Sequence, residues 1–270
     1  MQHLLYIPVL LAYVAVTVGH LVPWIVPAAV RERLRALGAA GVALHVVALG
    51  ADVAVGVLRP GLPEAVSSVS LGVMVMYATL ATGRQKALGL LLAPLGLVLL
   101  GLGLVVPHEE VAGLQQVQGV SAWLPIHLTL LFLGVAGFAL SGAVGALYLY
   151  VHKALKAKRF DVIARLPSLD WLDQTQFRAM LFGFLALTLG IAAGGALAVA
   201  SFQQSWVMDP KVVYTGVVWL IYAAALQSRL IWGRRGRFTA WVSISGFALM
   251  VFSLLGLNFI LSSSWHGYVG

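Results

Sequence analysis

The sequence contains no cysteine among its 270 residues, and charged residues make up only 10% of the chain. The first absence excludes disulfide bonds, iron–sulfur clusters and any thiol chemistry performed by this chain itself. Hydrophobic residues make up 61% of the chain. No soluble domain of this length can bury so much apolar surface. We therefore expect an integral membrane protein.

Long apolar runs recur along the chain and predict transmembrane helices. A bilayer core about 30 Å thick requires about 20 mostly apolar residues per helix, and a helix satisfies its own backbone hydrogen bonds in lipid. A β-barrel is excluded, since segments such as 87–106 are apolar on every face. The predicted fold is an all-α integral membrane protein, a bundle of eight transmembrane helices at 4–26, 38–58, 63–81, 87–106, 122–151, 174–201, 211–232 and 238–262.

Most of the predicted connections are short, which favours antiparallel neighbours within one bundle. We expect residues 1–270 to form a single polytopic membrane domain, with four helices in 1–106 and four in 122–270. Residues 1–26 lack a basic leader and carry an apolar run too long for a cleavable signal peptide. They are therefore expected to remain as the first helix.

Basic residues fall on alternate connections and predict the orientation of the chain. Of the 17 lysines and arginines, 15 lie on one side of the predicted bundle, and only Arg59 and Lys211 lie on the other. Because basic residues collect in cytoplasmic loops, both termini are expected outside a bacterial-type plasma (inner) membrane, which the chain crosses several times. The basic excess is explained by anionic lipid headgroups, so membrane lipid is an expected partner and nucleic acid is not.

Histidine is the residue type best suited to carry chemistry here, because neutral imidazole ligates metals and binds haem iron axially. His127 opens the fifth predicted helix and His266 follows the eighth, so both are expected at the outer rim. The apolar and aromatic connection 201–211 lies between them in the sequence. The alternative is a pair of interfacial histidines whose polar tips reach water while their rings pack on lipid or protein.

Polar residues inside predicted helices are a second group of candidates, because an ionisable group at membrane depth is expensive and often functional. His20 and His45 are expected at a similar depth, where two imidazoles could bind haem on an export route. The alternative for each is a buried, hydrogen-bonded histidine. Asp52 lies on the outer half of the same helix as His45, and we expect it to have a structural partner.

Several short segments of the second half carry a family likeness through their order and spacing. They are LPIHL at 124–128, LPSLDWLD at 166–173, GFL at 183–185, LTLG at 187–190, DPK at 209–211, WLIYA at 219–223, GRRGR at 233–237, AW at 240–241, GFA at 246–248 and HGY at 266–268. Together they resemble the CcsA/ResC-type cytochrome c assembly proteins and their CcmC and HemX-like relatives.

This resemblance implies a tryptophan-rich outer loop, the WWD segment, that cradles haem between two histidine ligands. His127 and His266 match the flanking pair of axial ligands, and Trp206, Asp209, Pro210 and Lys211 match the surviving part of the loop. Phe202, Trp206 and Met208 stand at the three tryptophan positions, and Val212 stands at the glutamate position. Phenylalanine and methionine keep apolar contact surface for a flat ligand, whereas the missing glutamate points toward the HemX-like branch.

By resemblance, the expected function is haem handling. The protein would bind haem b non-covalently at the outer membrane face for cytochrome c assembly, in haem delivery or export. The expected partners are haem, apocytochrome c and a ResB-like membrane subunit, and the chain is at most part of a haem ligation (cytochrome c synthase) complex. Two alternatives stay open: a HemX-like regulator of haem biosynthesis without ligation activity, and a transporter of another small molecule.

Overall fold

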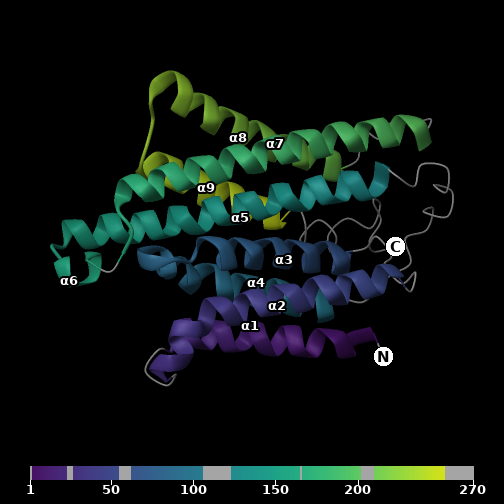
Figure 1. The fold of residues 1–270 in the computed structure, drawn as a ribbon. Helices are drawn as coiled ribbons and strands as arrows, with labels where there is room; N and C mark the ends of the chain where they lie inside the picture. Colours follow the sequence, from purple (N-terminus) through teal and green to yellow (C-terminus); the bar gives the residue numbers. More distant parts are fainter. Residues whose placement is uncertain are drawn as a thin grey trace. The chain divides into compact units, whose positions relative to one another are not determined.

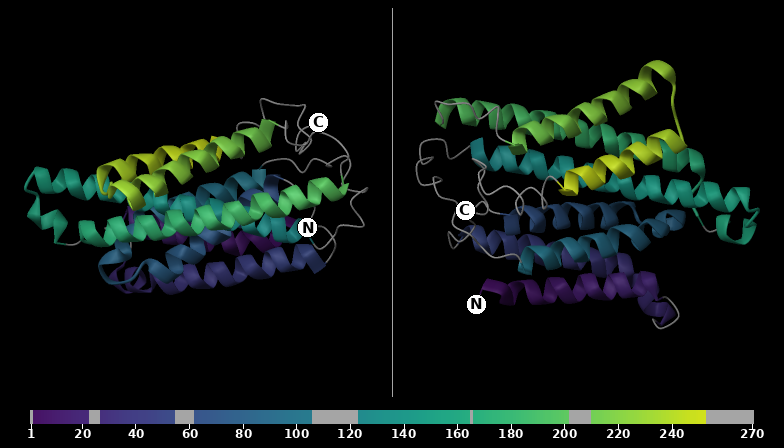
Figure 2. Two further views of the ribbon diagram at one scale, coloured as in Figure 1. Left: turned by 90° about the horizontal axis from the view of Figure 1, so that it is seen from above. Right: turned by 180° about the vertical axis from the view of Figure 1, so that it is seen from behind.

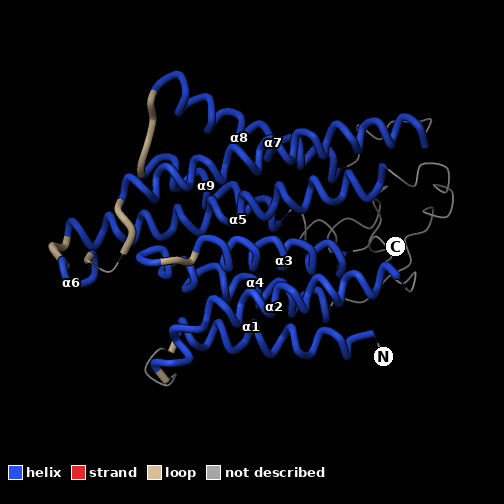
Figure 3. Tube along the Cα trace, in the orientation of Figure 1, coloured by secondary structure: helices blue, strands red, loops and turns tan. Residues whose placement is uncertain are grey.

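The computed structural model describes residues 2–22, 27–54, 62–105, 123–164, 166–201 and 210–252. Within these ranges the chain is helical, with loops and turns only at helix ends (Figure 3). The long helices are α1 (Tyr6–Leu21), α2 (Ala28–Ala54), α3 (Leu62–Leu80), α4 (Gly89–Val105), α5 (Trp123–Lys156), α7 (Leu169–Ser201), α8 (Pro210–Trp232) and α9 (Arg237–Val251). Three short helical segments accompany them, η1 (Gln2–Leu5), η2 (Gly83–Leu88) and α6 (Phe160–Ile163). The predicted all-α fold class is confirmed for the described residues.

Each of the eight predicted segments overlaps one long helix. Among the described residues, five helices are long and apolar enough to cross a membrane. The five spans are Glu32–Asp52, Pro63–Leu80, Gln85–Val105, Ile126–Lys156 and Leu169–Val199. Helices α1 and α9 are also apolar but have 16 and 15 residues in the described chain. The protein is therefore a multi-pass membrane protein, while the number of eight spans and the outside location of both termini stay predictions.

Helix α2 begins at Ala28, ten residues before the predicted start, and this is the largest difference among the helix starts. The added turns contain Arg31, Glu32, Arg33 and Arg35, and they replace most of the connection predicted between residues 26 and 38. Alanine, arginine, glutamate and leucine are strong helix formers, so the charged stretch continues the apolar helix instead of ending it. Short α6 was also not predicted.

Helices α5 and α7 also exceed their predicted lengths. Helix α5 has 34 residues, which at 1.5 Å per residue spans about 50 Å and exceeds the bilayer core. Helix α7 begins at Leu169, where the hydroxyl of Ser168 accepts a hydrogen bond from the Trp171 amide at 3.3 Å, as an N-cap does. Helix α8 begins at Pro210, the first-turn position that favours proline.

The helices group into two compact units. The first comprises 1–107 and 154–167 and contains α1 to α4. Here α1 packs against α2 and α4, and α3 packs against the same two helices, so each helix has two neighbours (Figure 1). Tyr13, Met74, Tyr77 and Leu92 are among the largest side chains buried between them. Close packing of these apolar side chains holds the four helices together.

The second unit comprises 108–153 and 168–270 and contains α7, α8, α9 and nearly all of α5. Helix α8 packs against α7 and α9, and Figure 2 shows α8 and α9 joined at one end. Helices α5 and α7 approach at glycines: a Cβ atom at Gly137 would lie 2.8 Å from the Gly183 Cα. Small residues permit such backbone contact between membrane helices.

Candidate functional site

His127 lies in the second turn of α5, against two glycines of α7. A Cβ atom at Gly194 would lie 2.5 Å from Cε1 and 2.7 Å from Nδ1 of the imidazole. A Cβ atom at Gly190 would lie 2.9 Å from Leu131, one turn further along α5. Because only glycine leaves this space, the α7 backbone comes close enough for the ring to reach it. Helix α7 therefore sets the position of the imidazole.

A hydrogen bond from His127 to α7 fixes the position of one ring proton. Nδ1 lies 2.7 Å from the carbonyl oxygen of Gly190. A carbonyl oxygen only accepts, so Nδ1 carries the proton and, in the neutral ring, Nε2 carries the lone pair. Metal-ligating histidines commonly donate their second N–H to a backbone carbonyl or carboxylate in this way, which fixes both tautomer and ring orientation. The geometry of His127 fits the donor chemistry of an axial haem ligand.

The other residues expected at the outer haem site lie outside the described residues. These are His266, Phe202, Trp206, Met208 and Asp209. Their convergence with His127 therefore stays a prediction. Of the expected loop, Pro210, Lys211 and Val212 are described, and they form the first turn of α8.

His45 is fully buried in the first unit, and both of its ring nitrogens have hydroxyl partners. Nδ1 lies 3.0 Å from the Tyr13 hydroxyl, and Nε2 lies 2.9 Å from the Ser67 hydroxyl. The ring also meets the edge of Tyr6, with 5.8 Å between centroids. Hydroxyls donate or accept, so they satisfy either neutral tautomer. An iron ion at His45 would have to displace one of these two hydroxyls.

Asp52 has a hydrogen-bond partner, as we expect for a carboxylate inside a helix bundle, and the partner is the phenol group of Tyr6. The Tyr6 hydroxyl donates a hydrogen bond of 2.7 Å to Oδ2 of Asp52. A hydrogen bond to a carboxylate is shorter and stronger than one between neutral groups, and it lowers the cost of placing the carboxylate in the bundle.

His20 belongs to a separate polar contact, close to the opposite end of α1. Its Nε2 lies 3.0 Å from the Tyr77 hydroxyl, and the Tyr77 ring lies over Gly38 of α2. His45 follows Gly38 by seven residues on the same helix, which is about 10 Å at 1.5 Å per residue. The expectation that His20 and His45 lie at one depth is therefore wrong. The expectation measures the depth of both histidines from predicted helix ends at residues 26 and 38. In the structure α1 ends at Leu21 and α2 begins at Ala28.

Ser67→Ala is expected to lower the free energy of unfolding by about 1–3 kcal/mol, because it leaves the buried Nε2 of His45 without its hydroxyl partner. Ser68→Ala is the matched control, since Ser68 is the next residue on α3 and is only partly buried. Both can be measured by denaturant unfolding of the detergent-solubilised protein. Equal losses for the two variants would show that the Ser67 bond contributes nothing specific.

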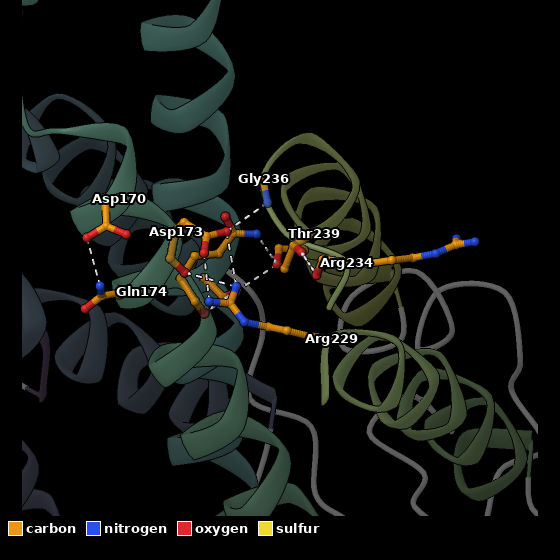
Figure 4. A network of polar contacts seen from close by, with 10 residues as sticks. Asp170, Asp173, Gln174, Arg229, Arg234, Gly236 and Thr239 are labelled. Atoms are coloured by element: carbon orange, nitrogen blue, oxygen red, sulfur yellow. Dashed lines mark hydrogen bonds and ion pairs between the residues drawn. The ribbon is translucent and has the colours of Figure 1, made fainter. Parts of the chain in front are cut away.

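The second unit contains a buried ion pair that the sequence did not predict (Figure 4). Arg229 of α8 donates two hydrogen bonds to the carboxylate of Asp173 on α7, of 2.7 Å and 3.1 Å. The Gly236 amide donates a third to Asp173, at 2.8 Å. The guanidinium also lies 4.3 Å from the centroid of the Phe177 ring. This network joins α7, α8 and the start of α9.

A second unpredicted polar cluster lies between α5, α7 and α9. The Ser141 hydroxyl donates to Ser243 Oγ at 2.9 Å, and Gln176 Nε2 donates to the same oxygen at 2.9 Å. All three residues are fully buried. Serine and glutamine in an apolar helix are a signal for such interhelical hydrogen bonds, although the sequence does not say which residues pair.

Comparison with known proteins adds an independent line of evidence to this geometry. Residues 60–264 match the family model described as cytochrome C assembly protein. The chain is 29% identical over 188 residues to the cytochrome c biogenesis protein CcsA of Chlamydomonas reinhardtii, an alignment that covers 68% of this chain and 52% of the relative. It is 27% identical over 170 residues to CcsA of Synechococcus sp. (strain RCC307), covering 55% of this chain and 54% of that protein.

A third relative, CcsA of Prochlorococcus marinus (strain MIT 9312), is 30% identical over 168 residues, which covers 55% of this chain and 54% of the relative. The chain thus spans about half the length of the curated relatives it matches. The family match includes α3 to α9, and therefore His127, its glycine contacts on α7 and the Asp173–Arg229 pair. Because this match extends over more than half of the chain, the protein belongs to the cytochrome C assembly protein family.

Proposed function

We propose that this protein binds haem at the outer membrane face and supplies it for cytochrome c assembly, by delivery or export. The observation that carries the proposal is the state of His127, whose Nδ1 proton is held by the Gly190 carbonyl so that Nε2 carries the lone pair. His266 is the proposed second axial ligand. Phe202, Trp206, Met208 and Asp209 are proposed to form the surface on which haem b lies, bound non-covalently.

Family membership supports this proposal, because the relatives are named cytochrome c biogenesis proteins. Two imidazole ligands would fill both axial positions of the iron, which suits holding or transferring haem better than oxygen chemistry. This chain has no cysteine, so the thiols of any thioether attachment must come from apocytochrome c. A ResB-like membrane subunit is the proposed partner, and the inner membrane is the proposed location, with both termini outside.

The absorption spectrum of the purified full chain tests the proposal. Added haem is expected to give a low-spin, bis-histidine spectrum that is lost in His127→Ala and in His266→Ala. His152→Ala is the control, because His152 lies at the opposite end of α5 and stacks on Tyr148. A protein that takes up no haem, or a His127→Ala variant with the wild-type spectrum, would overturn the proposal.

A second candidate function is HemX-like regulation of haem biosynthesis, and the composition of the outer loop favours it. By the resemblance, Phe202 and Met208 stand where the family has tryptophan, and Val212 stands where it has glutamate. The two functions differ in cells from which the gene is deleted. Loss of haem supply is expected to lower mature cytochrome c, whereas loss of regulation is expected to change early porphyrin precursors with cytochrome c unchanged.

A further inference from the structure

The connection between α8 and α9 presents three exposed arginines within four residues. Arg234 and Arg235 lie between two glycines, Gly233 and Gly236, whose φ angles are 60° and 75°. Arg237 is the first residue of α9. All three arginines are exposed. The two left-handed glycines let the chain reverse direction over a few residues, which brings three positive charges close together.

The Asp173 network holds this connection in place without neutralising its charge. Asp173 accepts the Gly236 amide hydrogen bond, and its carboxylate is paired with Arg229 through two further bonds. The side chains of Arg229 and Asp173 are only 8% and 10% exposed. The charge of Asp173 is therefore balanced inside the helix bundle, and the arginines of the connection keep theirs. Tyr148 supports the other side, since its hydroxyl lies 2.6 Å from the position of a Cβ at Gly236.

Exposed aromatic rings flank these arginines on both helices. Trp232 is 69% exposed, Trp241 58% and Phe238 41%. The Arg234 guanidinium carbon lies 5.0 Å from the Phe238 ring centroid and 6.0 Å from that of Trp232. Figure 4 shows the Arg234 side chain pointing away from the Asp173 ion pair. Exposed tryptophans beside arginines are typical of the level at which lipid headgroups meet the hydrocarbon.

We propose that this connection is a binding site for an anionic phospholipid. Arginine forks match the geometry of a phosphate group and bind it through paired hydrogen bonds. Leu230 and Ile231, which are 71% and 62% exposed, continue the apolar surface along α8, where acyl chains can lie. The connection 233–237 contains three arginines and no acidic residue. Its positive charge favours a headgroup with net negative charge over a zwitterionic headgroup. The proposal does not depend on haem binding.

Native mass spectrometry of the full chain in detergent, titrated with phosphatidylglycerol or with phosphatidylcholine, tests this site. One phosphatidylglycerol is expected to bind selectively. The variant R234Q/R235Q/R237Q is expected to weaken this binding by about a hundredfold, because each basic residue near a lipid surface contributes roughly 1 kcal/mol. The control K153Q/K156Q/R159Q removes the same number of exposed positive charges at the end of α5 and just after it. Circular dichroism checks the fold, and the three single variants are measured alongside.

Three results would overturn the proposal. Equal retention of both lipids would remove the selectivity, and equal weakening by the control variant would show that total charge decides binding. Displacement of the lipid by inorganic phosphate at equal concentration would assign the arginines to a soluble anion. Selective binding lost only in the α8–α9 variants would support the site.

Discussion

Asp173→Ala is expected to lower the free energy of unfolding by about 3–5 kcal/mol, because it leaves a buried guanidinium without its counter-charge. Arg229 is 8% exposed and has two of its hydrogen bonds on the lost carboxylate. The Gly236 amide loses its acceptor at the same time. The effect can be measured by denaturant titration in detergent micelles, followed by the loss of helical circular dichroism.

Asp170→Ala is the matched control for this prediction. Asp170 lies one turn earlier on α7, is exposed, and accepts one hydrogen bond from Gln174, so its loss is expected to cost less than about 0.5 kcal/mol. The double variant Asp173→Ala with Arg229→Met is expected to recover most of the loss, since it removes the unpaired charge as well. Equal stability of the two aspartate variants would show that the ion pair is unimportant for the fold.

The existence of the helices could be predicted from the sequence, because each apolar run is about as long as a helix that crosses the hydrocarbon core of a bilayer. Their ends could not be predicted where polar residues continue a helix beyond the apolar run. The turns of α2 from Ala28 to Leu37 are helical because of local propensity, whereas the prediction followed hydropathy and charge. That error also placed His20 and His45 at one depth.

His127 could be selected from the sequence because it follows Pro125 at the start of an apolar run and belongs to the family-like segment 124–128. Its surroundings could not be predicted. Gly190 is 63 residues away in the chain, and contact between them depends on the register in which α5 and α7 pack. Likewise Arg229 and Asp173 are 56 residues apart. The sequence contains an acid and a base at two helix ends, but it does not say that they meet.

Gly194→Val is expected to reduce haem binding as strongly as His127→Ala, although it leaves the imidazole in the chain. A Cβ at this position would lie 2.5 Å from Cε1 of His127, and valine adds two methyl groups beyond it. The ring must move, and it then loses the Gly190 carbonyl that holds its Nδ1 proton. Overpacking that forces a side chain out of its preferred rotamer costs about 1–3 kcal/mol. Haem titration followed by absorption gives the affinity.

Gly216→Val is the matched control, since a Cβ there meets nothing within 4 Å and the residue also lies in the second unit. It is expected to bind haem like the wild type. Nitrogen-15 NMR of labelled histidine in the haem-free protein gives a separate measurement, because the protonated Nδ1 of His127 should be seen in wild type and altered in Gly194→Val. If the NMR signal changes while haem affinity does not, His127 is not the ligand. If neither changes, the α5–α7 contact does not position the imidazole, and haem binding by the wild type would have to be explained without this contact.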